Sequence, residues 1–243
     1  MPDPVELGWI GDIVRLNLDE NARGAVFTYD AEERDWTEFD ARIRHAATGI
    51  RSDLLKRGQR VAVLERNHPV HFEALFAAAN MGLVCTFVDW RLSPEQIARA
   101  LNDSESRILF LGHEFEDLAD SIRLDVDTVI STITVGGAED EYEEWLETHE
   151  THEALMSAAR EIAAARIDEP VLRTYSALGK NGPTRGEYTH RQLLTSCSDL
   201  LRAKAIRPGD HSVVEEPLSR HSVVVKVLAT MAAGAVTTLI RDE

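Results

Sequence analysis

The stretch "YSALGKNGPTRGEYTH", residues 175–190, holds the residue types of an anion-binding loop. Glycines let backbone N–H groups come close to a phosphate, hydroxyls donate hydrogen bonds to its oxygens, and basic side chains neutralise its charge. These residue types suit a phosphate-bearing ligand, and the stretch is interpreted as a phosphate loop or the remnant of one. The candidate binding residues are Ser176, Gly179, Lys180, Gly182, Thr184 and Arg185.

The same stretch is also compatible with an ordinary turn on the surface between two strands. Asn181 and Gly182 followed by Pro183 are common turn residues. The stretch matches neither the P-loop pattern G-x-x-x-x-G-K-[ST] nor the dinucleotide-binding pattern G-x-G-x-x-G. Two alternatives therefore stay open, a basic turn that binds an anion and a turn that binds nothing.

Histidine and cysteine offer weaker candidates. His149 and His152 have a spacing compatible with a metal, but no third ligand is apparent among the acidic residues around them, so we predict no metal site. Cys197 and His190 lie seven apart on one face of a predicted helix, yet nothing marks a thiol nucleophile or its oxyanion hole. With Cys85 in an apolar run, the two cysteines are predicted to be buried free thiols, and no catalytic residue is assigned.

Composition limits the class of protein. A chain of 243 residues with 44% hydrophobic residues can form one large or two small globular domains. It has no apolar run long enough to span a bilayer, and its first residues lack a secretory signal pattern, so we expect a soluble cytoplasmic protein. The net charge of -16 argues against binding nucleic acid or an anionic membrane.

The apolar pattern predicts alternating strands and helices from residue 36 onward, which indicates an α/β protein with parallel sheet(s) flanked by helices. Ser93 and Pro94 form a strong helix start, while Gly58 and Gly82 are placed to end helices. Glu215 and Glu216 are predicted to form a solvated strand end. Strands are predicted at 60–65, 84–89, 107–112, 127–135, 171–176, 211–218 and 235–240, and helices at 37–58, 70–82, 93–104, 189–206 and 222–234.

Three segments follow from this pattern. Residues 1–136 are predicted to form a first α/β unit. Residues 137–169 are acidic and weakly patterned, which predicts a solvated helical excursion. Residues 170–243 are predicted to form a second α/β unit that contains the candidate loop.

Residues 36–112 resemble the N-terminal part of the adenylate-forming superfamily, which includes acyl-CoA synthetases and other AMP-binding ligases. The resemblance rests on the stretches "DWTEFDARIRHAATGI" and "RGQRVAVLERNHPVHFEALFAAANMGLVCTFVDWRLSPEQIARAL". In the second stretch, Gln59 stands in place of the family's Asp and Asp89 in place of its Asn. The resemblance implies the first lobe of the large N-terminal domain of these enzymes. It also implies ATP-dependent acid-thiol ligase chemistry with ATP and magnesium, if the loop is functional.

The family's phosphate loop, Y-T-S-G-T-T-G-x-P-K-G, is strongly altered in this chain. With Pro183 and Thr189-His190 fixing the register, the resemblance places Ala177 at the serine and Thr184 at the lysine. Leu178, Gly179, Lys180, Asn181 and Arg185 take the places of the family's Gly, Thr, Thr, Gly and Gly. His221 stands one position later than the histidine of the family's P-L-F-H, which turns a helical side chain by about 100 degrees. The resemblance therefore implies a degenerate loop and an ordinary, partly exposed His221.

These observations give an expectation about function. The family's adenine, ribose and catalytic-lysine segments do not follow within residues 1–243, so we expect a truncated homologue without independent ligase activity that acts as a binding or partner module and needs no cofactor. The alternatives are one part of a split acyl-activating ligase, or a small-ligand binding protein without chemistry. The apolar stretch "HSVVVKVLATMAAGAVTTLI" predicts a homodimer or a protein partner that covers the C-terminal edge.

Overall fold

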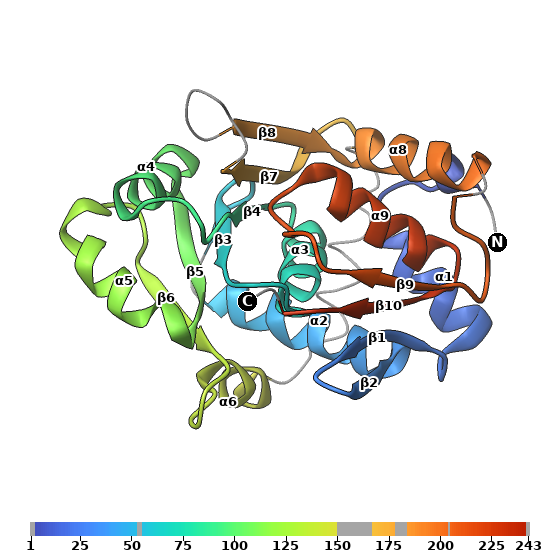
Figure 1. Ribbon diagram of the computed structural model, residues 1–243, viewed down its shortest axis with the longest axis horizontal. Helices are drawn as coiled ribbons and strands as arrows, with labels where there is room; N and C mark the ends of the chain where they lie inside the picture. The colour runs from blue at the N-terminus through green and yellow to red at the C-terminus, as the bar shows by residue number, and fades with distance from the viewer. Residues whose placement is uncertain (1–2, 53–54, 150–166, 178–183, 204, 242–243) are drawn as a thin grey trace.

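A computed structural model describes residues 3–52, 55–149, 167–177, 184–203 and 205–241, and it arranges their strands in two sheets (Figure 1). The six-stranded sheet has the order β6-β5-β3-β4-β7-β8, formed by Ser131–Val135, Ser106–Gly112, Arg60–Leu64, Val84–Val88, Pro170–Ser176 and Thr184–Thr189. The four-stranded sheet has the order β2-β1-β10-β9, formed by Glu32–Asp35, Ala25–Tyr29, Val236–Leu239 and His211–Val214.

Helices connect and flank these strands, as expected for an α/β fold. In the six-stranded sheet every pairing is parallel except that of β7 with β8, which is antiparallel. The predicted class is therefore confirmed. The helices are α1 (Asp12–Asn21), α2 (Trp36–Ser52), α3 (Val70–Met81), α4 (Pro94–Ser104), α5 (Glu116–Ile122), α6 (Glu141–Thr148), α8 (His190–Arg202) and α9 (His221–Ala232), with short 3-10 turns at Pro4–Glu6, His113–Phe115 and Arg123–Asp125.

The six-stranded sheet is buried on both faces. Along β3, Val61 and Val63 belong to a core shared with α2 and α3. Ala62 and Leu64 point the other way, into a smaller core formed with α4 and α5. A strand covered on both faces reads as a continuous apolar run, which is why β3 could be found in the sequence.

Helix α3 lies between the two sheets. The ring of Phe72 on α3 is 5.6 Å from that of Phe27 on β1 and 6.4 Å from that of Phe87 on β4, measured between centroids. Every residue from Val70 to Asn80 is buried. A helix enclosed on all sides needs mostly apolar residues, and the charged Glu73 of α3 is buried because Arg42 and Tyr142 bind it.

Several helix ends match the sequence prediction. The Ser93 side chain accepts a hydrogen bond from the Gln96 amide in a capping box, with Pro94 in the first turn of α4. Gly82 ends α3 with a left-handed φ of 66°. Gly58 also has a left-handed φ, 77°, but it lies in the turn before β3, and α2 ends earlier, at Ser52.

The acidic segment after β6 is not wholly solvated, contrary to expectation. Tyr142 on α6 is completely buried, and its hydroxyl donates to Glu73 over 2.8 Å. Trp145 of the same helix packs on α2 at Gly49, where any Cβ would overlap the indole. Although α6 is acidic, its face with Tyr142 and Trp145 points inward, so α6 is part of the packed structure. Residues 150–166 of the segment lie outside the described residues.

The N-terminal region contributes strands that the sequence pattern did not reveal. Strand β1 pairs with β2 in a hairpin and with β10 in parallel, with Phe27 opposite Thr237. Since β10 lies between β1 and β9, it is not a sheet edge, and the edges of this sheet are β2 and β9. The C-terminal strand therefore does not present the uncovered edge that we expected. Residues before 137 and after 169 supply strands to both sheets.

No helix in the described part of the chain is both long enough and apolar enough to cross a membrane.

Candidate functional site

The candidate loop connects β7 and β8, which form an antiparallel hairpin at one edge of the six-stranded sheet. In its register Ser176 faces Thr184 and Tyr175 faces Arg185. The structure therefore places three of the six predicted binding residues. The other three, Gly179, Lys180 and Gly182, lie outside the described residues.

The hairpin has two faces, because successive residues of a strand point to opposite sides. We call the first the α4 face, because its residues contact α4. It carries Arg173, Tyr175, Arg185 and Glu187. We call the second the α9 face, because it meets the residues at the start of α9. It carries Thr174, Ser176, Thr184, Gly186 and Tyr188.

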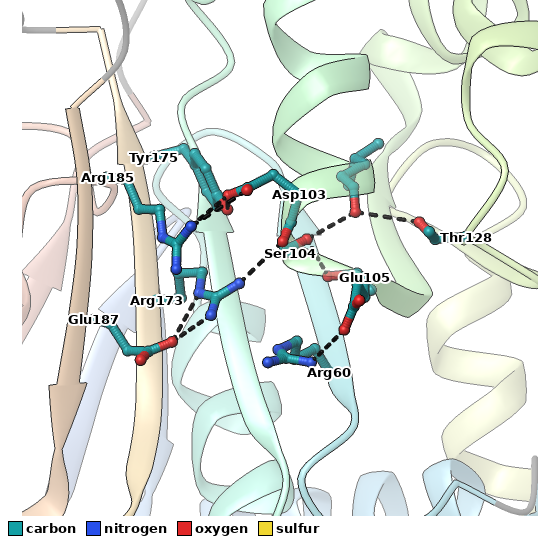
Figure 2. A network of polar contacts seen from close by, with 11 residues as sticks. Arg60, Asp103, Ser104, Glu105, Thr128, Arg173, Tyr175, Arg185 and Glu187 are labelled. Atoms are coloured by element: carbon teal, nitrogen blue, oxygen red, sulfur yellow. Dashed lines mark hydrogen bonds and ion pairs between the residues drawn. The ribbon is translucent and has the colours of Figure 1, made fainter.

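On the α4 face the polar groups are paired (Figure 2). Tyr175 and Arg185 converge on the Asp103 carboxylate at the end of α4, with Arg185 Nη1 3.0 Å from Asp103 Oδ2 and the Tyr175 hydroxyl donating to the same group. The Tyr175 hydrogen bond holds the pKa of Asp103 below its usual range. Arg173 donates to Glu187 and, over 3.2 Å, to the Asp103 carbonyl. The charge of Arg185 is thus offset by α4, on the side of the hairpin opposite Ser176.

On the α9 face three buried polar atoms have no hydrogen-bond partner among the described residues. They are Ser176 Oγ, Arg220 Nε and His221 Nε2. The three residues border one pocket of about 230 Å³, and Ser176 is only 7% exposed. Buried polar groups in folded proteins are usually satisfied by protein groups or by ordered water, so this pocket is a candidate site for a bound polar molecule. The pocket is lined by Thr174, Ser176, Thr184, Gly186, Tyr188, Ser219, Arg220, His221 and Ser222.

One wall of this pocket is an aromatic stack. The rings of Tyr188 and His221 lie nearly parallel, 15° apart, with centroids separated by 3.8 Å. Gly186 makes room for the Tyr188 hydroxyl, which any Cβ at residue 186 would overlap. Burial lowers the pKa of His221. His221 is half-buried as the first residue of α9, which agrees with the partly exposed histidine that we expected.

Asp89 fastens the base of the hairpin to the segment before α9. It lies just after β4, is 1% exposed, and accepts hydrogen bonds from the Ala177 amide (3.0 Å), the Ser219 hydroxyl (2.9 Å) and Arg91 (2.7 Å). Burial alone would raise its pKa, but these hydrogen bonds outweigh burial and lower it. Asp89 therefore remains ionised and holds Ala177 and Ser219 in fixed positions.

The cysteines lie in environments that do not favour a thiolate. Cys197 is buried, its thiol donates to the Val225 carbonyl over 3.7 Å, and burial raises its pKa to about 12. His190 accepts from the Ile10 amide over 3.5 Å, and burial lowers its pKa to about 4. Cys85 is likewise buried and free. These groups serve packing in the arrangement observed.

Of the remaining candidates, the structure describes His149, Glu215 and Glu216. His149 Nδ1 lies 2.6 Å from the Trp145 carbonyl oxygen, and His152 is outside the described residues. Where side chains are described, no group of three acidic, histidine or cysteine residues could hold a metal ion. Glu215 and Glu216 are exposed, as predicted.

Sequence reasoning missed four residues of this site: Asp89, Tyr188, Ser219 and Arg220. In the sequence, Asp89 stood out only as a departure from a family motif. A polar residue directly after a buried parallel strand is, however, a general signal for a ligand crevice. Ser219 and Arg220 directly precede a strongly predicted helix, a place where polar groups often meet ligands. Tyr188 gave no local signal, because its partner His221 is 33 positions away.

The fold and the pocket together define an α/β protein with a candidate ligand site on one face of the β7–β8 hairpin, beside the start of α9. The sequence profile of the family described as AMP-binding enzyme matches residues 17–243. The chain therefore belongs to the AMP-binding enzyme family.

Several proteins are similar to this chain. A long-chain-fatty-acid–CoA ligase of Thermus thermophilus is 35% identical over 104 residues, which is 43% of this chain and 19% of the ligase. A feruloyl-CoA synthase of Amycolatopsis is 23% identical over 205 residues, 84% of this chain and 38% of the synthase. The N-terminal domain of FACL13 from Mycobacterium tuberculosis has the same fold, with a TM-score of 0.83 at 18% identity, covering 98% of this chain and 58% of that one. The chain thus spans less than two-fifths of either curated relative.

Proposed function

We propose that this chain is a ligand-binding member of the AMP-binding enzyme family that forms no acyl-adenylate on its own. The observation that carries the proposal is the separation of the predicted loop residues between the two faces of the hairpin. Arg185 is paired with Asp103 on the α4 face, while Ser176 and Thr184 border the pocket on the α9 face.

The residues at the loop explain why we expect no adenylyl transfer. Transfer of an adenylyl group depends on donors and positive charge positioned on the phosphates. In the family's register Ala177 and Thr184 replace a hydroxyl and the lysine. Because Asp103 offsets the charge of Arg185, that residue contributes little to holding a triphosphate. ATP and magnesium are accordingly not proposed as cofactors.

The pocket on the α9 face supports the binding role. The two curated relatives are named for a long-chain fatty acid and for feruloyl-CoA. We propose that this chain retains a site for a ligand of this acyl class, or for the acyl-adenylate derived from it, in the cytoplasm and without nucleic-acid or membrane partners.

The test is an assay of pyrophosphate release from ATP, with magnesium and a fatty acid, and with a full-length fatty acyl-CoA ligase as positive control. We expect no release above the protein-free rate. An acyl-adenylate analogue should raise the melting temperature of the protein, because a ligand bound only to the folded state stabilises that state. Formation of acyl-adenylate by the purified chain would contradict the proposal.

A second candidate is one part of a split ligase, favoured by the small share of each curated relative that the chain spans. Either way we propose a homodimer or a complex with another protein, in which β9, an edge of the four-stranded sheet with the exposed Val213, is one available surface. Light scattering at high concentration and a pull-down test this. A monomer that captures no partner contradicts it, and adenylation that appears only when a second polypeptide is added favours the split ligase.

A further inference from the structure

We propose that Arg60 and Arg107 bind a phosphate group at the amino-terminal end of the six-stranded sheet. The two arginines border a pocket of about 290 Å³, which is lined by Gln59, Arg60, Glu105, Arg107 and Thr128. Strand β3 begins at Arg60, whereas Asp89 follows the end of the parallel strand β4, so the two lie at opposite ends of the sheet. The site is therefore separate from the pocket on the α9 face and goes beyond the function proposed above.

The strand register brings the two arginines together. On the neighbouring strands β3 and β5, Ala62 lies opposite Leu109, and both belong to the core formed with α4 and α5. Residues two apart in a strand share a face, so Arg60 and Arg107 are placed on this same face. The register shifts between Arg60 and Val61, but both arginines still line one pocket. Like charges at neighbouring positions of a sheet are destabilising, and an anion between them relieves the repulsion.

The pocket carries more positive than negative charge. Glu105 is the one carboxylate among the described residues that line it, and it lies 2.9 Å from Arg60. The Glu105 side chain is 71% exposed, so this ion pair is weak. Arg107 donates to the Thr128 carbonyl over 3.0 Å and has no carboxylate partner in the part of the chain that the structure describes. One positive charge is thus left over in a chain of net charge -16.

The hydrogen-bond donors around the pocket are only partly used. Arg60 Nη1 donates to Glu105, whereas Arg60 Nε is buried and has no partner among the described residues (Figure 2). Gln59 accepts from the Lys56 amide through its side-chain oxygen, which leaves its NH2 group as a donor. A buried donor costs free energy unless protein, water or a ligand satisfies it. The planar guanidinium fork matches the oxygens of phosphate, and two forks can hold one phosphate group.

The C-terminal turn of α4 lies beside the pocket, and its dipole opposes an anion. The carbonyl groups of residues 101–103 are, however, occupied, because they accept hydrogen bonds from the Glu105 amide and from Arg173. Asp127, next to Thr128, is exposed, so water and salt screen its charge. Glu105 is then the main group inside the pocket that opposes an anion.

The experiment is calorimetric titration of the whole chain with inorganic phosphate and, separately, with acetate, at low ionic strength in buffer free of other oxyanions. We expect saturable binding of phosphate and weaker binding of acetate. Arg107→Gln should weaken phosphate binding by roughly tenfold or more, because charge-assisted hydrogen bonds are lost. Arg207→Gln, which removes an exposed arginine outside the pocket, is the matched control and should bind as the unmodified chain does.

Glu105→Gln supplies a second readout, which a purely structural role of the arginines would not produce. It removes the opposing carboxylate and keeps the size of the side chain, so phosphate binding should become roughly threefold tighter. Phosphate should then raise the melting temperature of this variant by more than that of the unmodified chain. Unchanged or weaker phosphate binding by Glu105→Gln would contradict the site, even if Arg107→Gln does not fold.

Arg220→Gln distinguishes this site from the pocket on the α9 face. If Arg220→Gln abolishes phosphate binding and Arg107→Gln does not, the phosphate lies on the α9 face and the site at Arg60 and Arg107 is wrong. The absence of saturable phosphate binding, or equal affinity for phosphate and acetate, would also overturn the proposal. The acyl ligand of the proposed function is tested separately, by the effect of an acyl-adenylate analogue on the melting temperature.

Discussion

The two faces of the β7–β8 hairpin differ in how their polar groups are satisfied. On the α4 face, Arg173 pairs with Glu187, and Asp103 binds both Tyr175 and Arg185. On the α9 face, Ser176, Arg220 and His221 each have a buried atom with no partner in the part of the chain that the structure describes. Both faces belong to the same two strands, and both carry polar side chains.

The difference separates contacts that hold the structure together from groups that we propose are available to a ligand. Polar groups that satisfy one another hold the hairpin against α4 and have little left to offer a ligand. Polar groups that are buried and unsatisfied reduce stability, and they persist where a ligand completes them. The comparison predicts that removing a polar group on the α4 face lowers stability, whereas removing a polar group on the α9 face chiefly changes binding.

The largest effect on stability is expected for Arg173→Met. Arg173 is 4% exposed, and its loss leaves Glu187 and the Asp103 carbonyl without their donor. The free energy of unfolding should fall by about 2–3 kcal/mol, measured by urea denaturation. Arg207→Met, at an exposed position, is the control and should change it by less than about 0.5 kcal/mol. If both variants lowered the free energy of unfolding equally, the contacts of the α4 face would not have the structural role given to them.

A smaller loss is expected for Gly186→Ala on the α9 face. The added Cβ overlaps the Tyr188 hydroxyl, so Tyr188 must move away from His221. Losing the ring stack should lower the free energy of unfolding by about 1 kcal/mol. Because burial lowers the pKa of His221, exposing that ring should raise its pKa toward the ordinary value, which NMR titration of the imidazole can follow. An unchanged His221 titration would contradict the proposed wall of the pocket.

Tyr175→Phe should have a similar or smaller effect that depends on pH. It removes the hydrogen bond to Asp103 and should lower the free energy of unfolding by about 1 kcal/mol at neutral pH. Asp103 has a lowered pKa in the folded chain, so the stability from this contact is present above the ordinary aspartate pKa near 4 and is lost as pH falls through the lower folded value. Unmodified and variant chains should therefore converge in stability at acid pH. A difference that grows on acidification would show that the hydroxyl acts otherwise.

Much of the fold could be predicted from the sequence, because the signals are local. The apolar run of β3, the capping box at Ser93 and the terminating Gly82 all involve neighbouring residues. The pairing of β1 with β10 could not be found in this way, since Phe27 and Thr237 are more than 200 positions apart. The inward face of α6 was missed because Tyr142 and Leu146 are the only buried side chains described in a strongly acidic helix.

The site was predicted in part for the same reason. Glycine, lysine and hydroxyl composition located the hairpin, and strand alternation could have shown that Ser176 and Arg185 lie on opposite faces. The contacts of Arg185 with Asp103, and of Tyr188 with His221, join segments distant in sequence. Such contacts depend on the tertiary structure, and they decide which polar groups remain available to a ligand.

The most direct test of the central claim is a calorimetric titration with Mg·ATP and, in parallel, with a fatty acyl-adenylate analogue, using the unmodified chain and Arg220→Gln. The account predicts that the analogue binds and that Arg220→Gln weakens its binding, while Mg·ATP gives no heat of binding. Micromolar binding of Mg·ATP, unchanged in Arg220→Gln, would mean that "GKNGPTRG" still works as a phosphate loop, and it would contradict the division between the two faces.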